Sequence, residues 1–326
     1  LWYTEPARPG YDFKGWTNSS SWSDSATKYT NASGSKKGKD WASTFGSDVT
    51  SSDAEVTLYA QWEKNITHTF YYFNGQSATA SVIFHNGDTS KTMTIPDAAR
   101  STDKTYDGHS DWDFRGFSSE TAWNSELDIG KDTTQLTISN SDSNSTYYAQ
   151  YQRTTTITYV DYGDDAKQTN IQQETAYLNY NGGSVYSPEF KAITQNTMKY
   201  TENSVNGTKK ETWSAIGWTT STAQNAAAEK QAGDSIISHK DITYYGLYKK
   251  DVTLTYNPNG GTLSKKSDSY TRYANASNVA EATKQTYTMP TPSWKENSVT
   301  KYSLGGWTYG GNINNYSGYS ANSNFY

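Results

Sequence analysis

Cysteine is absent from this 326-residue chain, which excludes a disulfide framework and thiolate-ligated metal sites. The four histidines are too scattered for a zinc motif such as H-E-x-x-H. Hydrophobic residues make up only 33% of the chain, and no apolar run approaches the roughly 18 residues of a membrane span. We therefore expect no membrane insertion and a fold that depends on packing rather than on cross-links or metals.

The chain also has fewer positively charged residues than negatively charged ones. The chain has 28 Lys and Arg residues against 33 Asp and Glu residues, a formal net charge of −5. This balance provides no basic face for nucleic acid, so we expect no nucleic-acid partner. The chain starts at LWYTEP without a signal peptide and stops at NSNFY, and we expect it to be part of a longer protein.

Motifs for catalysis are missing as well. There is no G-x-S-x-G elbow, and the glycine-rich segment 34–40 is one residue short of a phosphate loop, with Asp40 where Ser or Thr should bind magnesium. Asp161, Asp164 and Asp165 lie beside a turn glycine and could hold calcium, but turn chemistry accounts for them equally well. We expect no enzymatic activity, no cofactor and no bound metal.

Aromatic rings are what the chain has in abundance: 28 Tyr, 11 Trp and 9 Phe, together 15% of its residues. Rings bury much apolar area per residue, so a few of them can hold a small domain together. Ser, Thr and Asn fill much of the rest, which suits solvated β-structure and turns.

The pattern aromatic–x–apolar–x–Gly–aromatic occurs four times at a spacing of about 100 residues, the size of one small domain. We call it the Gly–aromatic motif and number its occurrences as the first to fourth copy. Recurrence at equivalent places indicates core positions. Regular strand alternation would place the first ring, the apolar residue and the glycine on one face and the last ring on the other. The motif spans residues 11–16, 112–117, 213–218 and 302–307.

Two further patterns recur in order around this motif. The closing pattern reads LYAQW (58–62), YYAQY (147–151) and YYGLY (244–248). The opening pattern, a β-branched and aromatic run ending in a turn signal, reads THTFYYFNG (67–75), TTITYVDYG (155–163) and VTLTYNPNG (252–260). Each copy is predicted to run strand, turn, strand, proline-bearing crossover, Gly–aromatic strand, variable insert and closing strand.

Three stretches carry a resemblance to a known family: GYDFKGW (10–16), VTLYAQW (56–62) and VTLTYNPNGG (252–261). Within a unit, in the order opening pattern, Gly–aromatic motif and closing pattern, they resemble the Listeria–Bacteroides repeat family, typified by the B repeat of internalin B. The resemblance implies small β-grasp, ubiquitin-like domains strung along a bacterial cell-surface protein. The inner copies depart from the family pattern, because Phe117 replaces the tryptophan and Ala215 replaces the large apolar residue.

We therefore expect a mainly β protein with short helices, built as an elongated array of tandem β-grasp domains. The predicted domains are a truncated first unit at 1–63, complete units at 64–152 and 153–249, and a truncated fourth unit at 250–326. Short polar junctions at 63–67, 152–156 and 249–253 favour stiff connections.

Two local predictions concern the motif and its inserts. Strand glycines often mark a close approach, so Gly15 is interpreted as room for a closing-strand ring such as Trp62. In the third insert, residues 223–233 combine strong helix formers with a terminal glycine, which predicts a short helix.

The aromatic residues that do not repeat lie in the inserts and the tail, and these are the candidate binding residues. Loops carry function and exposed rings favour interfaces, although a loop tryptophan can also pack back onto its own domain. The candidates are Trp22, Trp41, Trp123, Trp294, Tyr309 and Tyr316.

Together with the resemblance, which implies a bacterial cell-surface protein, these observations favour a monomeric, non-enzymatic adhesin, secreted or held in the cell wall. It would bind a host extracellular protein, for example immunoglobulin, or a glycan through its variable loops. A purely structural stalk would have no ligand and would bury the insert rings. A carbohydrate-active enzyme would place two carboxylates in an aromatic-lined cleft.

Overall fold

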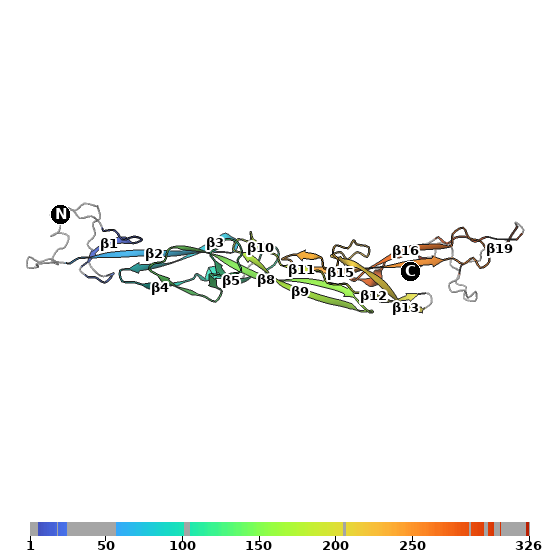
Figure 1. The fold of residues 1–326 in the computed structure, drawn as a ribbon, viewed down its shortest axis with the longest axis horizontal. Coiled ribbons are helices and arrows are strands. Elements are labelled where there is room, and N and C mark those ends of the chain that lie inside the picture. The colour runs from blue at the N-terminus through green and yellow to red at the C-terminus, as the bar shows by residue number, and fades with distance from the viewer. Residues whose placement is uncertain are drawn as a thin grey trace, which may run out of the picture. The chain divides into compact units, whose positions relative to one another are not determined.

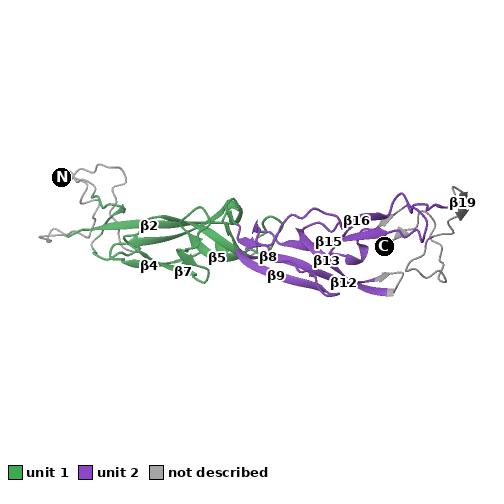
Figure 2. Cartoon of the chain, turned by 45° about the vertical axis from the view of Figure 1, so that its right-hand side comes forward, with its two compact units in different colours: residues 1–153, 176–186 green, residues 154–175, 187–326 purple. Residues whose placement is uncertain are grey.

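The computed structural model describes residues 6–17, 19–24, 57–100, 105–204, 207–286, 288–296, 299–302, 307 and 324–325. The chain forms two compact units, unit 1 from residues 1–153 and 176–186 and unit 2 from residues 154–175 and 187–326 (Figure 2). The described residues are mainly β-strand, as predicted (Figure 1). Their helical segments are the 3₁₀ turns η3 (Phe73–Gly75), η4 (Asp97–Arg100) and η5 (Val279–Glu281), and none is long or apolar enough to cross a membrane.

Unit 1 is organised around the long strand β2 (Tyr59–Tyr72). β2 forms an antiparallel hairpin with β3 (Gln76–His85) and pairs in parallel with the first part of β8 (Ser145–Tyr162). β8 in turn pairs antiparallel with β5 (Asp113–Ser118), so the strand order is β3–β2–β8–β5. The other strands of this unit are β1 (Asp12–Thr17), β4 (Ser90–Thr94), β6 (Ile129–Gly130), β7 (Gln135–Ser139), β10 (Val185–Tyr186) and the end of β9 (Lys167–Asn179).

Unit 2 repeats this order. β9 and β8 are neighbours, β8 pairs in parallel with β15 (Ile242–Thr255), and β15 pairs antiparallel with β13 (Gly207–Thr219). In unit 1, β4 follows the hairpin and pairs with β7 of the insert; in unit 2, β11 (Glu189–Lys191) follows the hairpin and pairs with β14 (Ser235–Ile237) of the insert. The other strands of unit 2 are β12 (Met198–Ser204), β16 (Ser267–Asn275), β17 (Gln285–Thr286), β18 (Trp294–Glu296), β19 (Val299–Tyr302) and β20 (Asn324–Phe325).

The three predicted junctions lie inside strands. Residues 63–67, 152–156 and 249–253 fall within β2, β8 and β15 respectively. The closing pattern of one copy therefore continues into the opening pattern of the next without a loop. The closing pattern is rich in aromatic residues and the opening pattern in β-branched and aromatic residues, and both kinds favour an extended backbone.

The Gly–aromatic motif has the same register in three copies. Gly15 lies opposite Gln61, Gly116 opposite Gln150, and Gly217 opposite Leu247, each just after a β-bulge. The bulge breaks the alternation predicted above, because one strand carries an extra residue there. As a result, Phe114 and Phe117 lie in the same core, with ring centroids 5.1 Å apart, rather than on opposite faces.

The motif glycine leaves room for backbone rather than for a closing-strand ring. A Cβ on Gly116 would overlap the carbonyl oxygen of Ile129, and one on Gly217 would lie 2.7 Å from the carbonyl oxygen of Lys230. Both neighbours belong to the chain returning from the insert. The φ angles of 145° and 121° are also in a region that favours glycine. Gly116 and Gly217 therefore lie against backbone rather than under a closing-strand ring. The interpretation of Gly15 as room for Trp62 stays a prediction.

The repeated rings form the cores of the complete copies, as predicted. Trp112, Phe117, Trp213 and Trp218 are fully buried. Hydroxyl groups of the closing pattern reach the opening hairpin: Tyr151 accepts the backbone N–H of Phe73 at 3.2 Å. Burial raises the pKa of the Tyr151 hydroxyl well above its usual value, so this group stays protonated across the physiological range.

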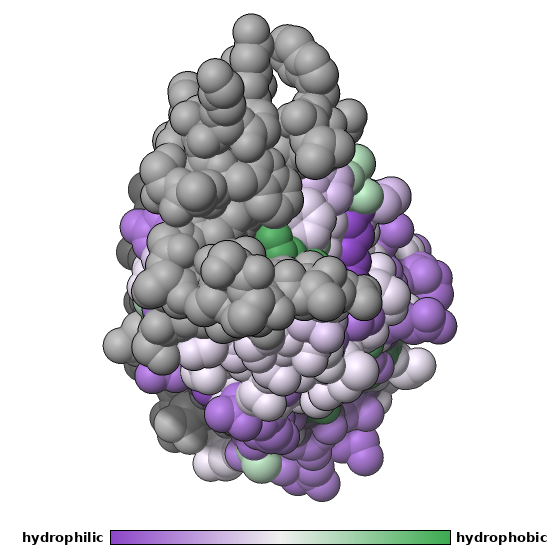
Figure 3. All heavy atoms as spheres, turned by 90° about the vertical axis from the view of Figure 1, so that its left-hand side faces the viewer, coloured by the Kyte–Doolittle hydropathy of each residue, from purple (hydrophilic) through white to green (hydrophobic). Residues whose placement is uncertain are grey.

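The composition, with only 33% hydrophobic residues, predicts a largely polar surface. Figure 3 shows one side of the molecule, on which the described residues are mostly hydrophilic and hydrophobic residues occur in small patches. The buried side chains of the described residues include the repeated rings and several β-branched residues, such as Ile66 and Ile157.

The predicted helix at residues 223–233 does not form; this segment is a series of turns and extended residues. Its backbone instead pairs with the motif, since Trp218 donates to the carbonyl of Lys230 at 2.8 Å and accepts from Glu229 at 2.8 Å. These tertiary hydrogen bonds replace the intrahelical ones, and local helix propensity is too weak to compete with them.

Candidate functional site

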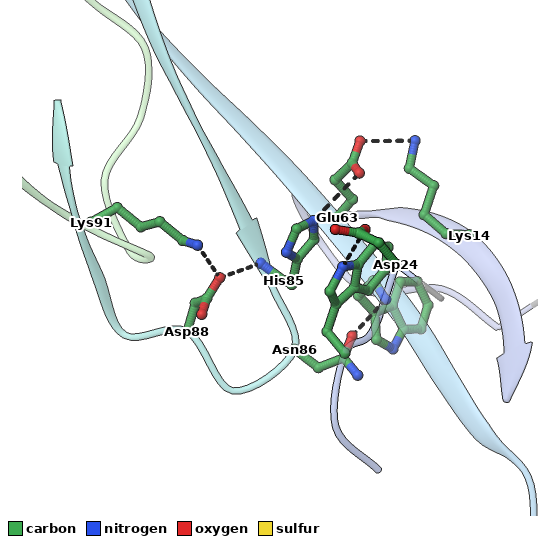
Figure 4. Close-up of polar contacts among 9 residues, drawn as sticks. Lys14, Asp24, Glu63, His85, Asn86, Asp88 and Lys91 are labelled. Carbon is green, nitrogen blue, oxygen red and sulfur yellow. Dashed lines mark hydrogen bonds and ion pairs between the residues drawn. The ribbon is translucent and has the colours of Figure 1, made fainter. Parts of the chain in front are cut away.

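In the first copy, Trp22 lies flat against the imidazole ring of His85 at the end of β3. The ring centroids are 3.8 Å apart and the planes differ by 3°. The indole N–H donates to Asp24 Oδ1 at 3.0 Å (Figure 4). Both rings are half-buried, so part of each stays open to solvent.

The surroundings of His85 are charged (Figure 4). Glu63 lies 3.7 Å from His85 Nε2 through one oxygen and 3.1 Å from Lys14 Nζ through the other. Asp88 accepts the His85 backbone N–H at 2.8 Å and pairs with Lys91 at 2.8 Å. The hydrogen bond from Lys91, and then that from the His85 backbone, hold the pKa of Asp88 below its usual value. The acidic groups of this cluster are therefore balanced by their own neighbours.

In the second copy, Trp123 lies against two tyrosines. It stacks on Tyr177 of β9, with ring centroids 5.4 Å apart and planes within 10°, and its centroid is 4.6 Å from that of Tyr186 on β10. Tyr177 and Tyr186 are opposite each other in the antiparallel β9–β10 pair. Arg115 places its guanidinium carbon 4.6 Å from the Tyr177 centroid. We call Trp123, Tyr177 and Tyr186 the aromatic platform.

The sheet holds this insert through the backbone of residues 121–125. Gln150, only 1% exposed, donates to the carbonyl of residue 122 and accepts the N–H of residue 124, both at 3.2 Å. Asn179 donates to the carbonyl of residue 121 at 2.8 Å. Arg115 donates to the carbonyls of residues 124 and 125 at 3.0 and 3.1 Å. The insert is therefore braced on both sides of Trp123.

An asparagine near the end of the second hairpin strand plays this bracing role in three copies and is not among the residues predicted from the sequence. Asn86 donates to the carbonyl of residue 20 at 3.3 Å, and Asn179 to that of residue 121 at 2.8 Å. Asn275 donates to the carbonyls of residues 221 and 223 at 3.0 and 3.1 Å. We call these the clamp asparagines. Asparagine is ordinary near turns, so its sequence signal is weak.

The third copy has a glutamine where the first two have an insert tryptophan. Trp22, Trp123 and Gln224 each lie six residues after the last ring of the Gly–aromatic motif. Gln224 donates to the carbonyl of Asn278 at 2.8 Å and accepts the N–H of Asn275 at 2.7 Å. This constant offset is the signal that would have set Trp22 and Trp123 apart from the other insert rings.

The remaining sequence candidates are not part of this arrangement. Trp294 is 42% exposed, and its ring lies over the β15–β16 turn, where a Cβ on Gly260 would approach it at 2.9 Å. Trp41, Tyr309 and Tyr316 lie outside the described residues.

The carboxylates considered for calcium have protein partners. Asp161 is buried and accepts the Tyr248 hydroxyl and the Asn196 N–H, the latter at 2.9 Å. Lys210 pairs with both Asp164 and Asp165. Within the described residues, no three His, Cys, Asp or Glu side chains lie close enough together to hold a metal ion.

The carboxyl groups with perturbed pKa values all shift in one direction. In the described part of the chain, each carboxyl group whose pKa departs clearly from its usual value has it lowered, by ion pairs or hydrogen bonds. A general acid for glycoside hydrolysis needs a raised pKa. These groups are therefore suited to structural ion pairs rather than to proton donation at neutral pH.

No protein-family model, no curated protein and no solved structure matches this chain.

Proposed function

We propose that this chain belongs to a bacterial cell-surface repeat protein that binds an extracellular ligand through its inserts and catalyses no reaction. The carrying observation is the insert tryptophan, which has the same offset from the motif in two copies and stacks in each on a ring of the following hairpin. Half-exposed rings on braced loops suit an interface, because they offer contact area at a low entropic cost.

The relation to the Listeria–Bacteroides repeats and to the β-grasp fold is part of the same proposal. Its support is a strand order found in both units: second hairpin strand, opening strand, parallel closing strand, Gly–aromatic strand. A β-grasp sheet likewise pairs its first and last strands in parallel at its centre. In the described residues, a two-stranded sheet and 3₁₀ turns stand where a ubiquitin-like domain has its helix.

The ligand would be a host extracellular protein, such as immunoglobulin, or a glycan. A structural stalk is the second candidate. The third copy fits it, because at the position of the insert tryptophan this copy has Gln224, whose side chain is bonded to the protein's own backbone. The partial exposure of Trp22 and Trp123 favours binding for the first two copies, since a spacer has no reason to expose rings.

The test is to screen the whole chain against two arrays, one of host immunoglobulins and matrix proteins and one of glycans. We expect a signal on at least one array, and its loss when both Trp22 and Trp123 are changed to Ala. Ile83→Ala is the matched control, because Ile83 is an exposed hydrophobic residue of β3 outside the inserts. If the folded chain bound nothing on either array, the proposal would be overturned and the structural stalk would be favoured.

A further inference from the structure

We propose that the aromatic platform binds carbohydrate, with a pyranose ring packed against Trp123 and its two tyrosines. This inference rests on the proposed function and names the ligand class of one insert. Besides the exposure of its rings, the platform has three properties that favour a sugar: the assembly of its rings, the polar groups that make no hydrogen bond within the described residues of the protein, and its size.

The rings of the platform come from three separate pieces of the chain and meet at one place. Tyr177 and Tyr186 are cross-strand neighbours with centroids 5.8 Å apart, and Trp123 lies against both. Tyr186 is 40% exposed, and the other two rings are half-buried. The C–H groups on one face of a pyranose are weakly positive and pack well against the negative faces of such rings.

The polar tips of the platform are available to a ligand. In the described part of the chain, the Trp123 indole N–H and the Tyr177 and Tyr186 hydroxyls make no hydrogen bond, in contrast to the Trp22 indole, which donates to Asp24. A sugar presents hydroxyl groups at the rim of its apolar face. It can therefore cover the rings and pair with these donors and acceptors at the same time.

The loop that carries Trp123 is held in place before any ligand arrives. Gln150, Asn179 and Arg115 together make five hydrogen bonds to its backbone. Sugar ligands gain little energy per contact, so a site for them benefits when ordering costs nothing further. The Arg115 guanidinium lies over the Tyr177 ring, 4.6 Å from its centroid, and helps to hold that ring in place.

The size of the platform favours a sugar over a protein. It consists of three rings, and the insert residues around them, Glu120, Thr121, Ala122, Ser125 and Glu126, are exposed and mostly polar. A stable protein interface needs about 800 Å² on each partner with a well-packed apolar centre. Three rings with a polar surround match one or two sugar rings instead.

The experiment uses the whole chain on an array of N-linked, mucin-type O-linked and plant glycans, followed by calorimetry with the strongest soluble oligosaccharide. Trp123→Ala should weaken binding by about 10- to 100-fold, as for a central aromatic contact. Tyr186→Phe, which removes one hydroxyl and keeps the ring, should weaken it by about 3- to 10-fold. Ile83→Ala should leave it unchanged, and far-ultraviolet circular dichroism checks that each variant is folded.

The outcomes separate this inference from the proposed function. Glycan binding that survives in folded Trp123→Ala and is unaffected by Tyr186→Phe would overturn the platform. Binding of immunoglobulin or matrix proteins without any glycan would also overturn it, while the proposed function would stand. If the folded chain bound nothing on the protein array or on the glycan array, both the platform inference and the proposed function would be wrong. Glycan binding that falls in the order expected for the two variants would support both.

Discussion

The second and third copies share one arrangement of strands, motif and clamp asparagine, which we call the frame. They differ at one position of the insert. Both have the bulged motif, the buried rings and a clamp asparagine bonded to the insert backbone. At one position, however, the second copy has Trp123, which lies on two tyrosines, and the third has Gln224, which closes its insert with two hydrogen bonds.

The difference separates what the repeat needs for folding from what it can vary. The frame tolerates either residue because in both copies the clamp asparagine bonds to the insert backbone, and Gln224 only adds two hydrogen bonds in the third copy. A ring at this position therefore adds a surface for recognition without being required by the frame. The predictions below test first what the two copies share and then what divides them.

The largest effect is expected at the shared motif glycine. Gly116→Val and Gly217→Val should each destabilise their unit by about 3 kcal/mol or more, because the side chain would meet the returning backbone and strain a positive φ. Urea unfolding followed by amide hydrogen exchange of the affected unit measures this. Gly130→Ala is the control, since a Cβ there has no atom within 4 Å. Equal stability of Gly116→Val and Gly130→Ala would refute the close approach.

The clamp asparagines come next. Asn275→Ala and Asn179→Ala should each cost about 2 kcal/mol, because partly buried hydrogen bonds to carbonyl and N–H groups of the insert and turn are lost. Faster hydrogen exchange in residues 219–233 of Asn275→Ala, and in 119–128 of Asn179→Ala, would locate the loss. Asn278→Ala, at an exposed side chain, should change little. Exchange that rises equally across the whole unit would contradict a local clamp.

Exchanging the dividing residue should have a smaller effect on stability. Trp123→Gln should reduce the stability of unit 1 by about 1 kcal/mol, because two ring contacts are lost while the backbone braces remain. The reciprocal Gln224→Trp should cost a similar amount through the loss of two hydrogen bonds. Thermal unfolding gives the loss of stability for each variant. A loss of unfolding free energy above about 4 kcal/mol in either would show that the frame depends on this residue.

The smallest effect is a pH dependence that also differs between the copies. Burial tends to raise the pKa of Glu211, but hydrogen bonds from Lys209 and Lys250 outweigh it, and the pKa is lowered. The same balance, with Arg153 as the cation, lowers the pKa of Asp111. A lowered folded-state pKa adds stability above the unfolded-state pKa, and this is lost as the pH falls through the folded-state value.

Stability should therefore fall as the pH drops below about 4, by less than about 1 kcal/mol per pair because solvent screens both. The Glu211 contribution should be the larger, since its side chain is 21% exposed against 57% for Asp111. Unfolding of Glu211→Gln and Asp111→Asn between pH 2.5 and 6 compares them. A variant whose difference from the unmodified chain is the same at every pH would contradict the assignment for that pair.

Much of the frame could be predicted from patterns that depend on neighbouring residues. The opening run at residues 67–75 predicted a strand and a turn, and the chain turns at η3 with Asn74 and Gly75 at positive φ. The recurrence of Trp112 and Trp213 predicted their burial. The bulge was not predictable, because it appears only in the register between the motif strand and the closing strand.

The sequence alone determined that the protein would be mainly β, that its rings would build the cores, and that the inserts would vary. These follow from composition and periodicity, which act through short-range backbone preference and burial. The tertiary structure decided what the motif glycine accommodates, that residues 223–233 would not be a helix, and that Trp123 would meet Tyr177 and Tyr186. Each of these depends on contacts between segments that are distant along the chain. Their hydrogen bonds and packing outweigh local propensity and cannot be read from a short stretch of sequence.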